Sequence, residues 1–125
     1  MSFLKSYSLV ELEELFKKEG LNSLYLIKTG SMSYTGNIRS VNNGTLFMDL
    51  PLKFTRGDNP MYAPAIIERE EFVKCVEVPL SGSITITTKK EGNISGEIIN
   101  VYNNRLLLKN SEIKTLYFQD FYDIE

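Results

Sequence analysis

The fold is decided by the stretch Gly96-Glu-Ile-Ile-Asn-Val-Tyr-Asn-Asn-Arg-Leu-Leu-Leu-Lys109. Its apolar residues alternate with polar ones through Ile98, and the polar pair Asn103-Asn104 then interrupts the run. A second apolar run, Leu106 to Leu108, follows at once. Alternation on both sides of two turn-forming residues is typical of a strand, a tight turn and a second strand.

The same layout occurs sixty positions earlier, in Gly36-Asn-Ile-Arg-Ser-Val-Asn-Asn-Gly-Thr-Leu-Phe-Met-Asp49. The two stretches align without a gap, and the alignment extends upstream, where Leu24, Leu26 and Tyr34 fall on Ile84, Ile86 and Ile94. A glycine inside each second strand, Gly36 and Gly96, predicts a sharp bend or a close backbone approach. We therefore predict two units in tandem, residues 1–79 and 80–125, joined near Pro79–Gly82. Units this small are marginally stable alone, so they should share a core or associate.

The composition excludes several classes of function. The 125 residues include no histidine and one cysteine, Cys75, so the usual zinc sites and every Ser-His or Cys-His mechanism are ruled out. No constellation of nucleophile and base is present, and we expect no enzyme activity and no cofactor. The net charge is −2, so any nucleic-acid site must be a local patch. No apolar run is long enough to span a membrane and the first residues lack a signal-peptide pattern, which predicts a cytoplasmic protein.

A short helix is predicted over Ser8 to Glu19. Ser8 and Glu11 have the spacing of a capping box, and Gly20 supplies a stop. One apolar face should cover the chain's own sheet, and a partner-binding face is the alternative. The apolar face, whichever of the two roles it has, consists of Leu9, Leu12, Leu15 and Phe16.

Strands are predicted over residues 24–29, 32–41, 45–50 and 65–78, and then over 83–89, 94–102, 105–109 and 113–124. Residues 51–64 hold three of the four prolines and are predicted to be irregular, either as a functional loop or as a long hairpin tip. The acidic cluster Glu68, Glu70 and Glu71 indicates a solvated turn, with a metal site as the less favoured alternative.

This pattern of one helix followed by five short, strongly bent strands resembles the Sm/Lsm/Hfq-like family. Residues 36–42 and 96–102 resemble its first motif, and residues 66–76 and 115–124 occupy the place of its second. The resemblance implies a mainly β chain with two small Sm-like barrels in tandem, each SH3-type and five-stranded, after a short N-terminal α-helix. It also implies self-association by strand-edge pairing, so that three chains would supply the six folds of an Hfq-like ring.

The resemblance further implies weak binding of single-stranded RNA on the turn faces of such a ring. The family's turn aspartate is replaced by Asn42 and Tyr102, and its stacking aromatic by Gly44 and Asn104. Amide groups and arginines remain available for bases and phosphates. Turn asparagines also have a purely conformational explanation, because they tolerate left-handed geometry. The candidate RNA-binding residues are Asn42, Asn43, Arg69, Asn103, Asn104 and Arg105.

The alternative function is a structural or assembly protein that keeps the strand-edge oligomerisation and binds no RNA. The acidic balance and the missing stacking residues favour it. In either case the strands Phe72–Val78 and Leu116–Ile124 should leave apolar edges that need cover. The candidate interface residues are Phe72, Val76, Val78, Phe118, Phe121 and Tyr122.

Overall fold

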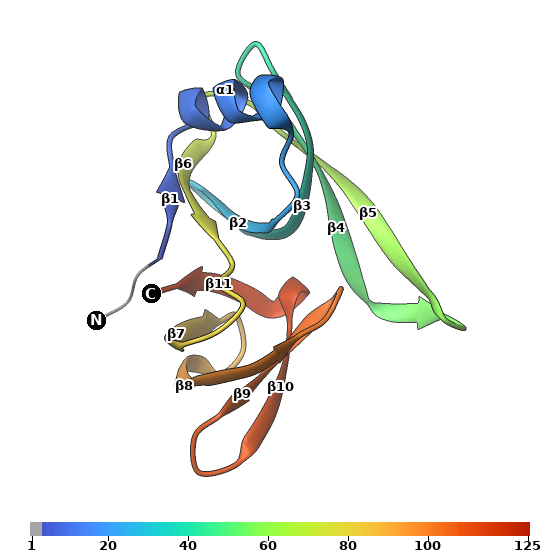
Figure 1. Ribbon diagram of the computed structural model, residues 1–125, viewed down its shortest axis with the longest axis vertical. Coiled ribbons are helices and arrows are strands. Elements are labelled where there is room, and N and C mark those ends of the chain that lie inside the picture. The colour runs from blue at the N-terminus through green and yellow to red at the C-terminus, as the bar shows by residue number, and fades with distance from the viewer. Residues whose placement is uncertain (1–3) are drawn as a thin grey trace.

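The computed structural model describes residues 4–125 and shows a mainly β chain with two antiparallel sheets and one α-helix, α1 (Leu9–Glu19). Figure 1 shows α1 and the first sheet at one end of the molecule and the second sheet at the other. The predicted mainly β class with an N-terminal helix is confirmed. The first sheet holds β1 (Ser6–Tyr7), β2 (Leu24–Thr29), β3 (Ser33–Asn42), β4 (Thr45–Arg56), β5 (Asn59–Ile67) and β6 (Phe72–Glu77). The second holds β7 (Ser83–Thr88), β8 (Gly92–Val101), β9 (Arg105–Lys109), β10 (Ile113–Tyr117) and β11 (Phe121–Ile124).

The two sheets have the same strand order. The first runs β6-β2-β3-β4-β5, with β1 added outside β6, and the second runs β11-β7-β8-β9-β10. In each, the last strand of the unit returns to lie beside the first. Within residues 4–125 neither sheet closes on itself by pairing its two edges, so both sheets are open where closed barrels were predicted.

The central hairpins repeat residue by residue. Asn37 pairs with Asp49 in the first, and Glu97 pairs with Lys109 in the second. A bulge follows one position later in both, after Ile38 and after Ile98. A bulge at the same place in both hairpins gives the two strands the same bend. The gapless alignment of these two stretches is confirmed.

The alignment fails by one residue in the preceding strands. Gly36 lies opposite Tyr25, whereas Gly96 lies opposite Ile84, because ten residues (26–35) separate the first pair and eleven (85–95) separate the second. The predicted match of Leu24 and Leu26 to Ile84 and Ile86 is therefore wrong. A one-residue shift turns every side chain to the other face of a strand. Leu26 consequently packs into the core of the second sheet, while Tyr25 stays in that of the first.

The helix α1 covers the first sheet, as predicted. The Ser8 hydroxyl accepts from the Glu11 amide at 3.1 Å, and the Glu11 carboxylate accepts from the Ser8 amide at 2.9 Å, so the capping box is complete. Leu12 is fully buried among the core residues of the first sheet. The apolar stripe therefore serves the chain's own core rather than an external partner.

Residues 51–64 are not irregular. β4 and β5 continue as a paired ladder to Arg56 and Asn59, and they project from the body as a long arm (Figure 1). The alternative of a long hairpin tip is confirmed. Pro60 and Pro64 are tolerated because β5 is an edge strand, where a missing N–H breaks no ladder bond.

The last predicted strand, 113–124, is interrupted. A 3-10 helix, η1 (Phe118–Asp120), separates β10 from β11, and these two strands lie at opposite edges of the second sheet. Phe118 and Phe121 flank the crossing, and both are buried with their rings edge to face at 5.3 Å. Burial of two aromatic rings inside one turn favours the change of direction over a continuous strand.

The two sheets are joined by polar contacts in addition to the apolar contact that Leu26 makes with the second core. The Asp123 carboxylate on β11 contacts Lys74 at 2.9 Å and Lys28 at 3.4 Å, both on the first sheet. The Ser33 hydroxyl donates to the Tyr122 carbonyl at 2.5 Å. The two units thus share both apolar and charged contacts, as their small size requires.

One buried hydroxyl at this junction lacks a partner, which yields a stability prediction. Thr35 is 3% exposed and its Oγ1 is the one buried side-chain polar atom within residues 4–125 that makes no hydrogen bond. Thr35→Val should raise the free energy of unfolding by about 1 kcal/mol, because it removes an unsatisfied polar group at nearly constant volume. Urea denaturation measures the change.

Thr88 provides the matched control, since it is 7% exposed and its hydroxyl accepts from the Glu91 amide at 2.8 Å. Thr88→Val should lower the free energy of unfolding by about 1 kcal/mol. Equal destabilisation by the two substitutions would show that the Thr35 hydroxyl is satisfied.

Candidate nucleic-acid interface

The six candidate RNA-binding residues fall into two separate places. Asn42, Asn43 and Arg69 gather at the β3–β4 turn, beside α1. Asn103, Asn104 and Arg105 gather at the β8–β9 turn, beside β4. Figure 1 shows the β3–β4 turn next to α1 and the β8–β9 turn, which belongs to the second sheet, next to β4. One chain therefore does not present both turns on one continuous surface.

The β3–β4 turn is built by internal contacts and has acidic neighbours. The Arg69 guanidinium packs over Gly44 and donates to the Asn43 carbonyl at 3.1 Å. The Glu13 carboxylate accepts from the Gly44 amide at 3.0 Å, and this hydrogen bond lowers the pKa of Glu13. The side chains of Asn42 and Asn43 are exposed, and Asn43 has the left-handed φ of 51° that a tight turn requires. The charge of Glu13 opposes a phosphate here.

The β8–β9 turn uses one of its asparagines internally. Asn104 is 3% exposed, and its amide donates to the carbonyls of Leu52 at 3.2 Å and Lys53 at 3.4 Å. Its oxygen accepts from Arg105 at 2.9 Å. Asn104 thus fastens the second sheet to β4, and its side chain is not free to contact a base. Arg105 remains accessible in part, with its guanidinium 4.3 Å from the centre of the Tyr102 ring.

The candidate oligomer residues mostly fill the chain's own cores. Tyr122 is exposed and Phe72 is half-buried. β6 was expected to be an open edge, but it is covered. β1 pairs along it, and the Glu77 amide donates to the Lys5 carbonyl at 2.8 Å. The remaining four are buried: Val76, Val78, Phe118 and Phe121.

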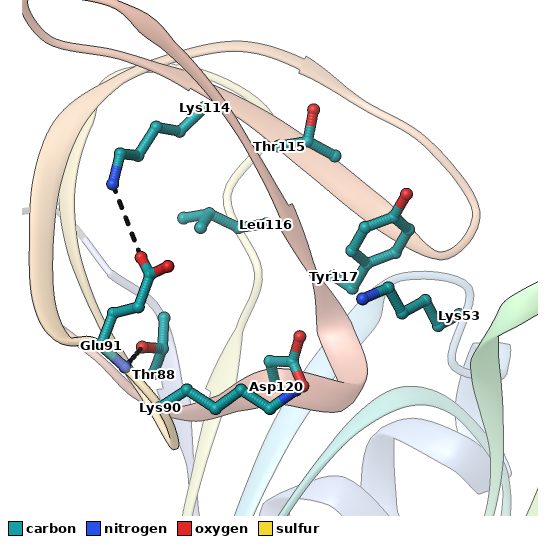
Figure 2. A pocket seen from close by; sticks show the side chains of 9 residues that line it. All are labelled: Lys53, Thr88, Lys90, Glu91, Lys114, Thr115, Leu116, Tyr117 and Asp120. Carbon is teal, nitrogen blue, oxygen red and sulfur yellow. Dashed lines mark hydrogen bonds and ion pairs between the residues drawn. The ribbon is translucent and has the colours of Figure 1, made fainter.

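The structure shows a lysine-rich cleft that the sequence did not indicate. It lies beside β10 of the second sheet (Figure 2). Here β10 faces the β7–β8 turn across a gap of about 410 Å³. Three lysines and two carboxylates line it, in a chain whose net charge is −2. We call it the lysine cleft; its residues are Lys53, Thr88, Lys90, Glu91, Lys114, Thr115, Leu116, Tyr117 and Asp120.

Side-chain contacts cross the lysine cleft between β10 and the β7–β8 turn. The Lys114 ammonium lies 3.5 Å from the Glu91 carboxylate, and the two side chains are 37% and 61% exposed, so this pair is weak. The Lys53 ammonium lies 4.9 Å from the centre of the Tyr117 ring, a cation–π contact. Lys90 reaches in from the β7–β8 turn (Figure 2). Three lysines and an aromatic ring therefore line one gap.

The lysine cleft adjoins the β8–β9 turn. Tyr117 is the cross-strand partner of Arg105, so their side chains project from the same face of the sheet. The Asn104 amide in turn holds the Lys53 carbonyl. The cations come from β4, the β7–β8 turn and β10, which are far apart in the chain and meet only through the fold. Only the adjacent pair Lys89-Lys90 was visible as a local signal.

Neither the single cysteine nor the acidic cluster at residues 68–71 forms a reactive or metal-binding site among the described residues. Burial raises the pKa of Cys75 to about 12, which keeps its thiol neutral in the core. Glu68 accepts from the Thr45 hydroxyl at 3.1 Å, and Glu71 accepts from the Glu68 amide at 3.3 Å. Within the described residues, no three His, Cys, Asp or Glu side chains gather as a set of metal ligands.

Within residues 4–125 there is no helix with the length and apolar character needed to cross a membrane. Comparison of the chain with protein-family models, with curated proteins and with solved structures gives no significant match.

Proposed function

We propose that the chain is an Sm-like tandem module that assembles through a strand edge. The observation that carries the proposal is the repeated strand order, in which the fifth strand of each unit returns beside the first, with a bulge and a close-packed glycine at the same place in both. Such bent open sheets resemble the Sm/Lsm/Hfq-like family, whose members associate by pairing strand edges.

The edge best suited to association is β10. β5 carries Pro60 and Pro64, which have no N–H to donate, and prolines at an edge oppose strand addition. The edge of β11 is engaged by the first sheet through the bond from Ser33 to the Tyr122 carbonyl. β10 contains no proline and has one paired neighbour, β9.

The register of β10 shows which backbone groups are free. The Phe118 amide donates to the Asn104 carbonyl at 3.0 Å, and the Asn110 amide donates to the Glu112 carbonyl at 3.1 Å. Even-numbered residues of β10 therefore bond toward β9, and the N–H and C=O groups of Ile113, Thr115 and Tyr117 point to the open edge. A second copy of the chain can pair with these groups, either β10 to β10 in a dimer or with another edge in a ring of three chains.

Thr115→Pro tests this assembly. It removes one outward N–H at a position that makes no ladder bond to β9, so the fold should persist while association weakens at least ~10-fold. Thr115→Val keeps the N–H and should associate like the wild type. Light scattering across a concentration series measures the mass, and sedimentation confirms it. A wild type that stays monomeric at high micromolar concentration would contradict the proposal.

We further propose single-stranded RNA as the ligand, in the weak, salt-sensitive mode that few cations allow. The observation that favours it is Arg105 stacked on Tyr102, which offers a guanidinium and an aromatic ring on one surface. Arg69, by contrast, is engaged with the β3–β4 turn near Glu13. An assembly protein that binds no RNA is the alternative.

Filter binding of oligouridine and oligoadenine at low salt separates these two functions. Arg105→Ala should weaken binding several-fold, and Arg69→Ala should change it by less than ~2-fold. If neither the wild type nor the variants retain RNA, the assembly function alone stands.

A further inference from the structure

We propose that the lysine cleft binds one nucleotide unit, with its phosphate between Lys90 and Lys114 and its base against Tyr117. This inference rests on the RNA-binding part of the proposed function and assigns it a site on a chain whose β10 edge is unpaired, because a second copy paired to β10 would lie along Thr115 and Tyr117, which line the cleft. The gap of about 410 Å³ lies in the range of small-ligand pockets, roughly 300–1,000 Å³.

The phosphate is assigned by the available cations. Lys90 makes no ion pair within residues 4–125, and Lys114 has only the exposed pair with Glu91. Exchange of an exposed carboxylate for a phosphate costs little, because exposed ion pairs contribute little stability. Lysine ammonium groups act as point charges for phosphate without needing one fixed geometry.

The base is assigned by Tyr117. Its ring is half-buried at the wall of the cleft, and the Lys53 ammonium lies against it. Tyrosine rings stack with any base and are typical of sequence-tolerant single-strand sites. The RNA can continue from the cleft to Arg105, which pairs with Tyr117 across β9 and β10, and on to Tyr102.

Two carboxylates of the cleft repel the phosphate. Removal of a carboxylate should therefore strengthen binding, just as removal of the lysines should weaken it. Glu91 and Asp120 line the same gap, and Glu91 contacts Lys114 directly at 3.5 Å. Loss of the charge of Glu91 frees Lys114 and removes a repulsion. Glu91→Gln should therefore strengthen binding by about 3-fold at low salt, whereas a merely structural role of this ion pair would weaken or leave binding unchanged.

The experiment is fluorescence anisotropy of labelled oligouridine and oligoadenine with the full chain, over a series of salt concentrations. The double variant Lys90→Gln/Lys114→Gln should weaken binding ~10-fold or more. It should also reduce the salt slope by about 0.7, because the two lysines together neutralise one phosphate, and each neutralised phosphate of a single strand contributes about 0.7. The control Lys17→Gln/Lys18→Gln makes the same charge change on α1 and should alter affinity by less than ~2-fold. Circular dichroism establishes that each variant is folded.

Titration calorimetry with uridine monophosphate and with inorganic phosphate identifies the ligand. RNA binding that responds to Arg105→Ala but not to the lysine variants would overturn the cleft and leave the RNA function intact. Binding of uridine monophosphate that needs Lys90 and Lys114, without RNA binding, would support the cleft as a free-nucleotide site and overturn the RNA function. Equal affinity for phosphate and uridine monophosphate would overturn the role of Tyr117, and no binding of any probe would overturn the cleft and the RNA function together.

Discussion

Replacing Gly36 or Gly96 with alanine should lower the free energy of unfolding by about 3 kcal/mol in each case, the upper part of the range for overpacking a well-filled site. A Cβ at Gly36 would collide with the carbonyl oxygen of Asp49, and one at Gly96 would lie 2.6 Å from the carbonyl oxygen of Lys109. Both obstacles are backbone atoms of the paired strand, which cannot move without breaking the ladder. Urea denaturation of the two variants measures the loss.

Gly30→Ala is the matched control, because a Cβ there meets no atom within 4 Å and the residue is not in the left-handed region. Its effect should stay within about 0.5 kcal/mol, as for other surface substitutions. Similar losses at Gly36 and Gly96 would show that the bent hairpin is needed in both units. A tolerated alanine at either position would contradict the close packing.

These glycines show why the central hairpins could be predicted from the sequence. Alternation of apolar residues fixes the faces of a strand, and a tight polar turn fixes its register. A glycine in mid-strand marks a close backbone approach, and both glycines occupy such a contact. Each signal is local, so each is visible in a single stretch of chain. The capping box of α1 is local in the same way.

The features that were mispredicted depend on contacts between distant segments. The segment between the paired residues is one residue shorter in the first unit (26–35) than in the second (85–95), and this difference decides whether Leu26 faces its own sheet or the other one. The break between β10 and β11 depends on where Phe118 and Phe121 find a core. Residues 51–64 look irregular because of their prolines, yet they form strands because β5 has a free edge.

The candidate site was less predictable than the fold, for a related reason. Asn104 has the identity of a turn residue, and only the fold shows that its amide is used against Leu52 and Lys53. Lys53, Lys90 and Lys114 are separated by more than twenty residues each, so no stretch of sequence shows them as a basic cluster. Their convergence follows from the placement of β4 against η1, where the Lys53 amide donates to the Gln119 side chain at 2.7 Å.

Asp123→Asn should lower the free energy of unfolding by about 2 kcal/mol at pH 7. The carboxylate is 14% exposed and contacts two lysines of the first sheet, at 2.9 and 3.4 Å. The expected loss lies between about 1 kcal/mol for exposed pairs and the 3–5 kcal/mol for breaking fully buried ones, because Lys28 and Lys74 remain partly exposed. Asp49→Asn is the control, since its pair with Arg39 at 3.5 Å is exposed and should contribute less than about 0.5 kcal/mol.

The dependence on pH gives this prediction its sharpest form. Burial alone would raise the pKa of Asp123, but the hydrogen bonds from Lys74 and the Ile124 amide and the charges of Lys74 and Lys28 together lower it. A carboxyl whose pKa is lower in the folded state stabilises the fold above its ordinary pKa of 3.8, and this contribution is lost as the pH falls through and below that value. The difference in unfolding free energy between wild type and Asp123→Asn should therefore be largest at pH 7 and shrink toward pH 3. A difference that stays constant over this range would mean that the asparagine costs stability through packing, and that the ion pairs with Lys28 and Lys74 do not hold the two sheets together.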